Sequence, residues 1–247
     1  MKKVCIALLI MVILSGISVG IYYGFFFKPE EPPIIIEPPV QELTPAEKII
    51  VDTALTQTQA TRRIVDVKMP TFSNLSDYSF QEVINKKIAD SINPYINEIA
   101  IVADETSKAR YEYKVDFERY NNDNYVSIVV LQNYYTGPSG MRSNVWKDTY
   151  TVDVVNNKEL RLVDVCAFSN YKDVIVYEVN RIAKEKNINL IAGNGLQDIP
   201  DTQRFYIKDK KLYIYFEPAS IAPYLDGEMH FEMPFMFDNG KFILGIQ

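Results

Sequence analysis

The hydrophobic pattern of this chain changes its period part-way along, and that change restricts the fold more than any other feature. Between Ser79 and Ala109, apolar residues recur at steps of three and four, which places them on one face of a helix. Pro94 interrupts this pattern, and we expect a kink or a fresh helix start there. From Tyr111 to Phe117, apolar residues alternate with charged ones, as in a strand with one face in water. A helix followed by strands of this kind indicates an α+β protein.

Two more strands follow this first alternating segment. Residues 125–135 are almost all apolar, which is typical of a central strand, and residues 144–155 return to alternation. Turn residues separate them at 121–124 and 137–140. The sequence therefore predicts a three-stranded antiparallel meander, with an earlier strand over 63–72 that is closed by Met69-Pro70.

The C-terminal part repeats the combination of helix and strands. Residues 169–186 carry a second amphipathic stripe, and a long loop over 187–203 follows. Residues 205–207 and 212–216 predict a hairpin, and a further alternating strand leads to Pro234. The predicted fold class is α+β: an antiparallel sheet, made of the meander and the C-terminal hairpin, with two main helices packed on it. We place an N-terminal α+β domain at 61–158 and a C-terminal α+β domain at 159–247.

The N-terminal segment predicts a membrane anchor. Val4 to Phe27 is a run of 24 residues without a formal charge, longer than the ~20 residues that a helix needs to cross a bilayer. Lys2 and Lys3 before it favour a cytoplasmic N-terminus and a body outside the cytoplasm. A cleaved signal peptide is the alternative. Residues 28–60 are predicted as a linker, extended and rich in proline and glutamate over 28–44 and weakly helical over 45–60.

Charge and cysteine content exclude several classes of protein. The net charge is −6, and it becomes −8 when Lys2 and Lys3 are set aside. A nucleic-acid binder would carry a basic surface, so no nucleic-acid partner is expected, whereas an acidic body suits cationic partners. Cys5 and Cys166 lie too far apart to pair and form no zinc motif. We expect Cys166 to be a buried, unreactive thiol, and we expect no cofactor.

The sequence offers little for catalysis. His230 is the only histidine, and it shares one face of a predicted strand with Glu228 and Glu232. Such a trio could hold a divalent ion. Met229 and Phe231, on the opposite face, instead favour an ordinary strand with one wet and one buried side. No nucleotide-binding or hydrolase motif occurs. We therefore expect no enzyme activity and assign no catalytic or metal residues.

A motif near the C-terminus resembles that of a known family. The signature F-x-P-Y-E-I-A-P-Y-x-x-G-x-x-x-F-x-I-P marks a pair of bacterial extracytoplasmic domains of unknown function. These domains form the outer region of RsiV-type anti-sigma factors, and they precede the catalytic domain of PdaC-type peptidoglycan deacetylases. The resemblance covers about residues 61–246. The matching positions here are Phe216, Pro218, Ile221, Ala222, Pro223, Tyr224, Gly227, Phe231 and Pro234.

This chain departs from the family pattern at two places. Ala219 and Ser220 stand where relatives carry Tyr-Glu. In the meander loop, relatives often have Thr-Gly-Gly-Ala-His-Gly, whereas this chain keeps only Thr136 and Gly137. The histidine of that loop is therefore missing, so any metal or polar role of that residue is lost, and a binding role for the loop is in doubt.

The resemblance implies a binding role, because the outer region of RsiV-type proteins binds lysozyme. With only Met1 to Lys3 on the cytoplasmic side and no deacetylase domain, we expect neither sigma-factor binding nor deacetylation. The hypothesis is a membrane-anchored, extracytoplasmic binding or sensing protein whose ligand is a lysozyme-like cationic protein or cell-wall glycan (peptidoglycan). Tyr224 would anchor the ligand, unless it fills the core beneath the turn. The predicted contact residues lie in two loops: Thr136, Gly137, Pro138, Ser139, Pro218, Ile221, Pro223 and Tyr224.

Two other classes of function stay open at this point. One is a cell-wall enzyme that uses His230 with Glu228 or Glu232. The other is a structural envelope protein that packs with other proteins and binds no small ligand.

Overall fold

The fold is described from a computed structural model. The structure describes residues 42–245, apart from 61, 103–109, 138–142, 192, 194 and 224–228. The predicted anchor over 4–27 and the first part of the predicted linker lie outside these residues. None of the helices in the described part of the chain is long and apolar enough to cross a membrane.

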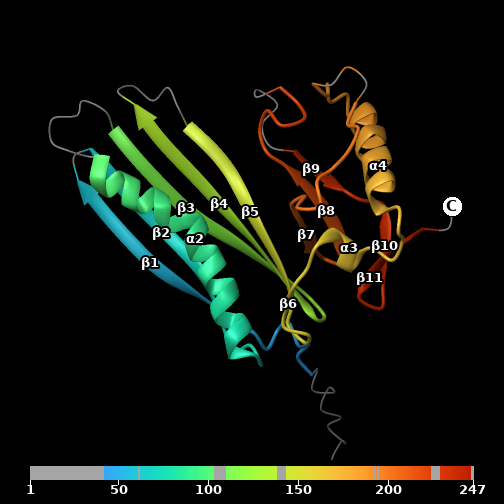
Figure 1. Ribbon diagram of the computed structural model, residues 1–247, viewed down its shortest axis with the longest axis horizontal. Coiled ribbons are helices and arrows are strands. Elements are labelled where there is room, and N and C mark those ends of the chain that lie inside the picture. Colours follow the sequence, from blue (N-terminus) through green and yellow to red (C-terminus); the bar gives the residue numbers. More distant parts are fainter. Residues whose placement is uncertain are drawn as a thin grey trace, which may run out of the picture. The chain divides into compact units, whose positions relative to one another are not determined.

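A six-stranded sheet forms the first half of the described chain (Figure 1). The order of strands in the sheet follows their order in the sequence. The strands β3 and β4, and β4 and β5, pair antiparallel, so the predicted meander is confirmed. The strands are β1 (Ile50–Ala60), β2 (Arg63–Ser73), β3 (Arg110–Asn122), β4 (Tyr125–Gly137), β5 (Ser143–Asp153) and β6 (Lys158–Glu159).

Two details of this sheet differ from the sequence-based expectation. The expected weak helix over 45–60 is wrong, because most of that segment is the edge strand β1. The prediction of one antiparallel sheet, made of the meander and the C-terminal hairpin, is correct only in part, because the hairpin lies in a separate sheet and, within the large sheet, β2 and β3 run parallel. The helix α2 (Tyr78–Val102) connects these two strands, as parallel neighbours require a crossover of this kind.

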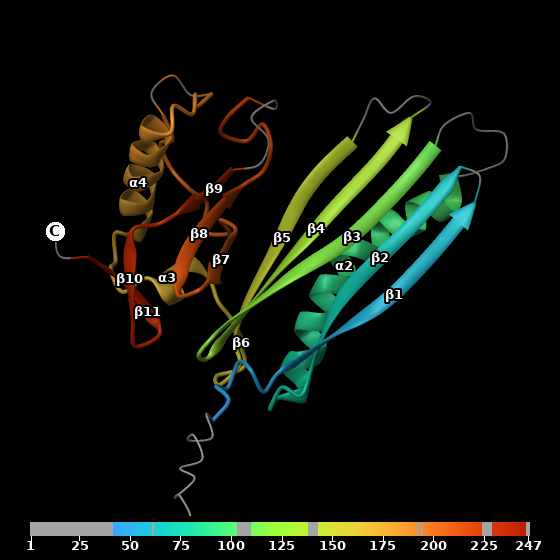
Figure 2. The same ribbon diagram turned by 180° about the vertical axis from the view of Figure 1, so that it is seen from behind.

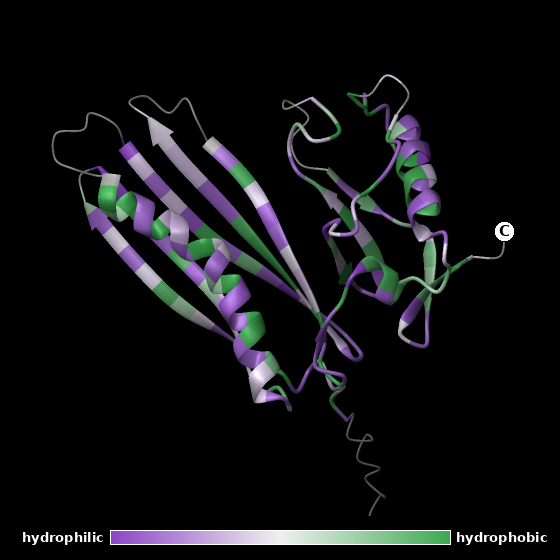
Figure 3. Cartoon of the chain, viewed as in Figure 1, coloured by the Kyte–Doolittle hydropathy of each residue, from purple (hydrophilic) through white to green (hydrophobic). Residues whose placement is uncertain are grey.

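The helix α2 covers one face of the six-stranded sheet, and the reverse view shows the strands in front of it (Figures 1 and 2). Ile84, Ile88 and Ile92 are almost fully buried against residues of β2, β3 and β4. The helix begins after Asp77, whose carboxylate accepts a hydrogen bond from the backbone N–H of Phe80 at 3.1 Å. It continues through Pro94, so no fresh helix starts there. Hydrophobic and hydrophilic residues alternate along it as the sequence predicts (Figure 3).

The second half of the chain forms its own core on a smaller sheet. The strands β7 (Phe205–Lys208), β8 (Lys211–Phe216) and β9 (Met229–Glu232) pair antiparallel, which confirms the predicted hairpin and the strand after it. The helix α4 (Tyr171–Glu185), also predicted, buries Ile175 and Val179 in this core. A one-turn helix α3 (Leu162–Val165) precedes it. The hairpin of β10 (Phe235–Asp238) and β11 (Lys241–Leu244) was not anticipated.

Cys166 lies in the second core as the sequence analysis expects. It is a buried free thiol, and burial raises its pKa to about 12. A thiol with so high a pKa is protonated at neutral pH and is a poor nucleophile.

Buried and partly buried hydrogen bonds from the end of β3 and from β4 join the two halves of the chain. The side-chain amide of Asn122 donates to the carbonyl oxygen of Ile207 at 2.9 Å and accepts from the backbone N–H of Lys210 at 2.8 Å. The backbone N–H of Ile207 donates to the hydroxyl of Ser127 at 3.0 Å. The hydroxyl of Tyr125 donates to the carbonyl oxygen of Gly240 at 2.6 Å. The strand β7 is therefore fixed to the first sheet by polar contacts as well as by packing.

Candidate functional site

Arg204 lines several of the clefts on the surface of the described residues. It precedes β7 and forms ion pairs with Asp148 of β5, at 2.7 Å, and with Glu217, the residue after β8. Three clefts of about 500, 400 and 460 Å³ all include Arg204 in their walls. Volumes of this order suit small-molecule sites. The side chain of Arg204 thus connects segments of the chain that lie far apart in the sequence.

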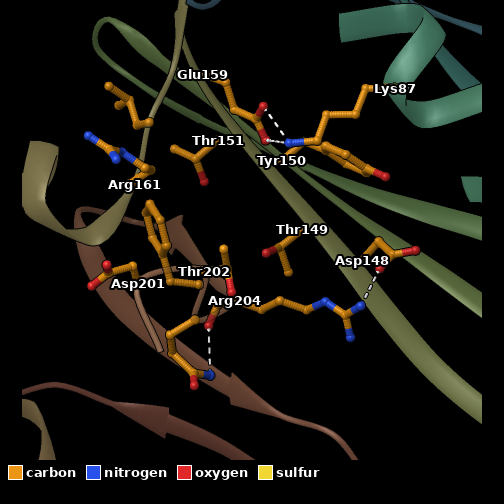
Figure 4. A pocket seen from close by; sticks show the side chains of 13 residues that line it. Lys87, Asp148, Thr149, Tyr150, Thr151, Glu159, Arg161, Asp201, Thr202 and Arg204 are labelled. Carbon is orange, nitrogen blue, oxygen red and sulfur yellow. Dashed lines mark hydrogen bonds and ion pairs between the residues drawn. The ribbon is translucent and has the colours of Figure 1, made fainter. Parts of the chain in front are cut away.

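The first cleft, which we call the charged cleft, is shown in Figure 4. The guanidinium of Arg204 reaches Asp148 on one side, and the ammonium of Lys87, from α2, reaches Glu159 at 2.7 Å on another. Both cations are therefore neutralised within the cleft. The cleft is lined by Lys87, Asp148, Thr149, Tyr150, Thr151, Glu159, Leu160, Arg161, Asp201, Thr202, Gln203, Arg204 and Phe205.

A chain of buried polar groups runs from the charged cleft into the sheet. Asp148 accepts a hydrogen bond from the amide of Gln132 at 2.5 Å, and the amide oxygen of Gln132 accepts from the hydroxyl of Tyr113. Gln132 and Tyr113 are fully buried. Burial raises the pKa of Asp148, while the charge of Arg204 opposes that rise. Burial also raises the pKa of Tyr113. These bonds hold Asp148, and through it Arg204, in one position.

The second cleft, which we call the aromatic cleft, lies next to the first. Tyr95 of α2 is the centre of a ring cluster, with its centroid 5.0 Å from that of Trp146, 5.5 Å from that of Tyr134 and 5.3 Å from that of Tyr113. The rings are tilted against one another, as aromatic pairs prefer. Tyr95 and Trp146 are half-buried and keep part of their surface in the cleft. The cleft is lined by Tyr95, Tyr134, Asn144, Val145, Trp146, Arg204, Glu217 and Pro218.

Comparison with known families identifies both halves of the chain. One family model, described as Deacetylase PdaC, matches residues 56–139, and another, described as Protein of unknown function (DUF3298), matches residues 163–236. The chain therefore contains a PdaC domain followed by a DUF3298 domain. We refer below to residues 56–139 as the PdaC region and to residues 163–236 as the DUF3298 region. A search of curated proteins finds no match.

Two solved structures share this fold. A member of the DUF3298 family from Bacteroides fragilis aligns with a TM-score of 0.59 at 13% identity, covering 80% of this chain and 96% of the other. A DUF3298 family protein from Pseudomonas aeruginosa aligns with a TM-score of 0.54 at 10% identity, covering 77% of this chain and 92% of the other. At such low identity, the likeness shows the fold alone.

The predicted contact residues fall into three groups. Pro218 lines the aromatic cleft, and Ile221 lines the third cleft although its side chain is mostly buried in the DUF3298 core. Pro223 is exposed, whereas Thr136 and Gly137 are half-exposed at the end of β4. Pro138, Ser139 and Tyr224 lie outside the described residues. Binding by any of these residues stays a prediction.

Ala219 and Ser220, which differ from the family motif, form a turn with an unusual backbone conformation. Ala219 adopts a positive φ of 63°, a conformation that is uncommon for a residue with a side chain. The next residue, Ser220, donates from its hydroxyl to the carbonyl oxygen of Glu217 at 2.6 Å. This short turn holds Glu217 and Pro218 beside Arg204.

His230 faces tyrosines rather than a set of metal ligands. Its Nδ1 lies 3.1 Å from the hydroxyl of Tyr206, and its Nε2 lies 3.3 Å from the ammonium of Lys147. Glu232 instead bonds to Lys211 and Tyr213, and these hydrogen bonds lower its pKa. Within the described residues, no three His, Cys, Asp or Glu side chains are grouped to hold a metal, and Glu228 lies outside them. Met229, Phe231 and Met233 are buried, so the predicted inner face of this strand is confirmed.

No local sequence pattern marks the residues that build the clefts. Arg204, Asp148 and Glu217 come from three separate segments and form no local motif. Tyr95 follows Pro94 inside a helix, where an aromatic residue is usually assigned to the core. Trp146, on the meander strand β5, is half-buried and forms part of a cleft wall.

Proposed function

We propose that this chain is a membrane-anchored, extracytoplasmic protein that binds a ligand from the cell envelope or its surroundings, without catalysis of its own. The proposal rests on the paired PdaC and DUF3298 regions, on the uncharged run over 4–27, and on the clefts around Arg204. The observation that most supports the binding role is the position of Pro218 in a cleft wall. This family-motif residue lines a cleft together with Arg204, Glu217 and exposed aromatic surface.

The first candidate ligand is a cationic protein of the lysozyme type. The part of the chain after Lys3 has a net charge of −8, which would attract such a partner and speed its association. Loops carried by a rigid sheet are common contact surfaces, and the turn at Glu217–Ser220 is one such loop. Glu217, nearly half exposed, would offer its carboxylate to a basic side chain.

The test is calorimetry of the full chain with lysozyme and with soluble peptidoglycan fragments. We expect heat and a saturating isotherm with lysozyme, weakening as salt is raised because charges contribute to the attraction. Pro218→Ala should weaken binding by about tenfold, equivalent to ~1.4 kcal/mol. Pro234→Ala is the matched control, because Pro234 is an exposed proline of the same motif outside the contact loops. Absence of heat with lysozyme and with every fragment would contradict the binding role.

The second candidate ligand is the glycan of the cell wall. It is favoured by the aromatic cleft, since aromatic faces beside hydrogen-bonding side chains suit rings that carry both C–H and O–H groups. The same calorimetric series separates the two candidates. A glycan-binding protein would give heat with the peptidoglycan fragments alone, whereas a protein that binds cationic proteins would give heat with lysozyme.

A further inference from the structure

The aromatic cleft is lined by aromatic rings from three different elements, α2, β4 and β5. Tyr95 comes from α2 and Trp146 from β5, and their planes lie at 50° to each other. Tyr134 and Tyr113 pack behind Tyr95 and are almost fully buried. The half-buried rings of Tyr95 and Trp146 thus present an apolar surface whose position is fixed from behind.

The hydroxyl of Tyr134 in this cluster lacks a hydrogen bond. It is buried and has no partner of acceptable geometry among the described residues. Burial, and after it the nearby Glu98 carboxylate, raises its pKa.

One cation and two carboxylates meet at the edge of the cleft. Arg204 is paired with Glu217 inside the cleft wall and with Asp148 behind it. The cleft therefore has no uncompensated cation to hold an anion. It does offer donors from Arg204 and acceptors from Glu217, and Asn144 supplies both kinds of group. A neutral ligand that both donates and accepts hydrogen bonds fits these groups.

We propose that the aromatic cleft is a binding subsite for a neutral sugar chain, holding one or two pyranose rings against Tyr95 and Trp146. A sugar ring has an apolar C–H face for the aromatic rings and hydroxyl groups that can donate to Glu217 and accept from Arg204. A proline-rich peptide, which aromatic grooves also take, offers carbonyl acceptors but no backbone N–H at its prolines. It would leave Glu217 without a donor from the ligand. This assignment rests on the binding role proposed above and names its site and its ligand class.

The chain contains its own reporter for this cleft, because Trp146 is the only tryptophan. The experiment titrates the purified full chain with a tetramer of N-acetylglucosamine and follows tryptophan emission, with calorimetry in parallel. We expect a saturable change in emission that tracks the heat. A neutral proline-rich peptide of similar size should give no change, and an equal response to it would overturn the assignment to sugar.

Two variants locate the effect. Tyr95→Leu removes the ring opposite Trp146 and should weaken the tetramer's affinity at least tenfold. Tyr120→Phe is the matched control, because Tyr120 stacks on Tyr206 and its hydroxyl bonds to Glu118, away from the cleft. Its affinity should match that of the parent chain. An unchanged affinity in a folded Tyr95→Leu protein would overturn the proposal.

The outcome also separates this proposal from the broader binding role. Heat with lysozyme but no emission change with the tetramer would overturn the sugar subsite and leave the binding role standing. Heat with the tetramer but no change in emission would place the glycan elsewhere on the protein and overturn the assignment to this cleft.

Discussion

Asp148 is a carboxylate that folding moves out of water and into contact with Arg204 and Gln132. Its side chain is only 15% exposed. A buried ion pair gains attraction but loses hydration, and the balance depends on the remaining hydrogen bonds. Here both carboxylate oxygens are bonded, one to Arg204 and one to Gln132. The raised pKa of Asp148 indicates that lost hydration still outweighs these contacts.

This balance predicts a specific pH dependence of stability. Because burial raises the pKa of Asp148 in the folded state, the folded chain binds the proton more tightly than the unfolded one. The corresponding stabilisation is fully present below the unfolded pKa of about 3.9 and is lost as the pH rises through the folded-state pKa. Urea unfolding from pH 3 to pH 7 should therefore show the parent chain losing free energy of unfolding relative to Asp148→Asn. A difference between the two proteins that stays constant over this range would contradict the prediction.

Loss of the hydroxyl should affect the free energy of unfolding differently at two buried tyrosines of the same cluster. Tyr113 donates to Gln132, so Tyr113→Phe leaves a buried acceptor unpaired and should cost about 1–3 kcal/mol of unfolding free energy. Tyr134 has no such bond, so Tyr134→Phe should leave the free energy unchanged or raise it slightly. Urea denaturation of both variants measures the contrast. Equal losses in the two would show that the Tyr134 hydroxyl is hydrogen-bonded after all.

At the scale of elements, α2 both covers the large sheet and supplies the cleft residue Tyr95. The proline just before Tyr95 sits inside this 25-residue helix, where it removes one backbone hydrogen bond. Ile92 before it and Ile99 after it are both buried. The helix is therefore held on the sheet on both sides of the proline.

Replacement of this proline should stabilise the protein. Pro94 is exposed, so Pro94→Ala restores a helix N–H without removing core contacts. We expect a gain of about 2 kcal/mol in unfolding free energy, below the full ~3 kcal/mol helix penalty because proline also restricts the unfolded chain. Asn97→Ala, on an exposed position of the same helix, is the control and should gain much less. A loss of stability in Pro94→Ala would show that the bend at Pro94 is needed for packing.

The two helices could be predicted because their apolar residues recur on one face, as Ile84, Ile88 and Ile92 do in α2. The edge strand β1 could not, since both of its faces are exposed and it shows no alternation of apolar and polar residues. Its Thr and Gln residues instead matched the composition of a linker. The β10–β11 hairpin did carry a signal that was overlooked. Asn239 and Gly240, both with positive φ, form a turn typical of tight hairpins.

The clefts were harder to predict than the fold. Arg204, Asp148 and Glu217 lie on separate segments, and the sequence gives no sign that folding brings them together. Pro218 of the family motif does line the aromatic cleft. Long-range pairing of single charged residues is a property of the tertiary structure, and no local pattern encodes it.

For the molecule as a whole, the PdaC and DUF3298 regions are joined by buried polar contacts. Asn122 bonds to the backbone of both Ile207 and Lys210, and Ser127 bonds to the backbone of Ile207. The backbone groups of β7 and of the turn after it that these side chains satisfy would lose their partners if the regions separated. Loss of such partners carries a free-energy penalty.

The two regions should therefore unfold together. Trp146 emission reports on the first core and far-ultraviolet circular dichroism on the whole chain, and we expect both to give one midpoint in urea. Asn122→Ala should lower the free energy of unfolding by about 1–3 kcal/mol. The neighbouring Asn121→Ala, at an exposed position, should lower it far less. Two separate midpoints in the parent chain would contradict a single cooperative unit.

The strand β1 ends the large sheet, and among the described strands it pairs only with β2. Its 11 residues include a single charge, Asp52, and neither lysine nor proline, the residues that commonly protect such an edge. A long row of backbone donors and acceptors is thus open to any extended chain that comes near. We expect the concentration at which this protein is stored, rather than its folding free energy, to limit how long it stays monomeric in solution.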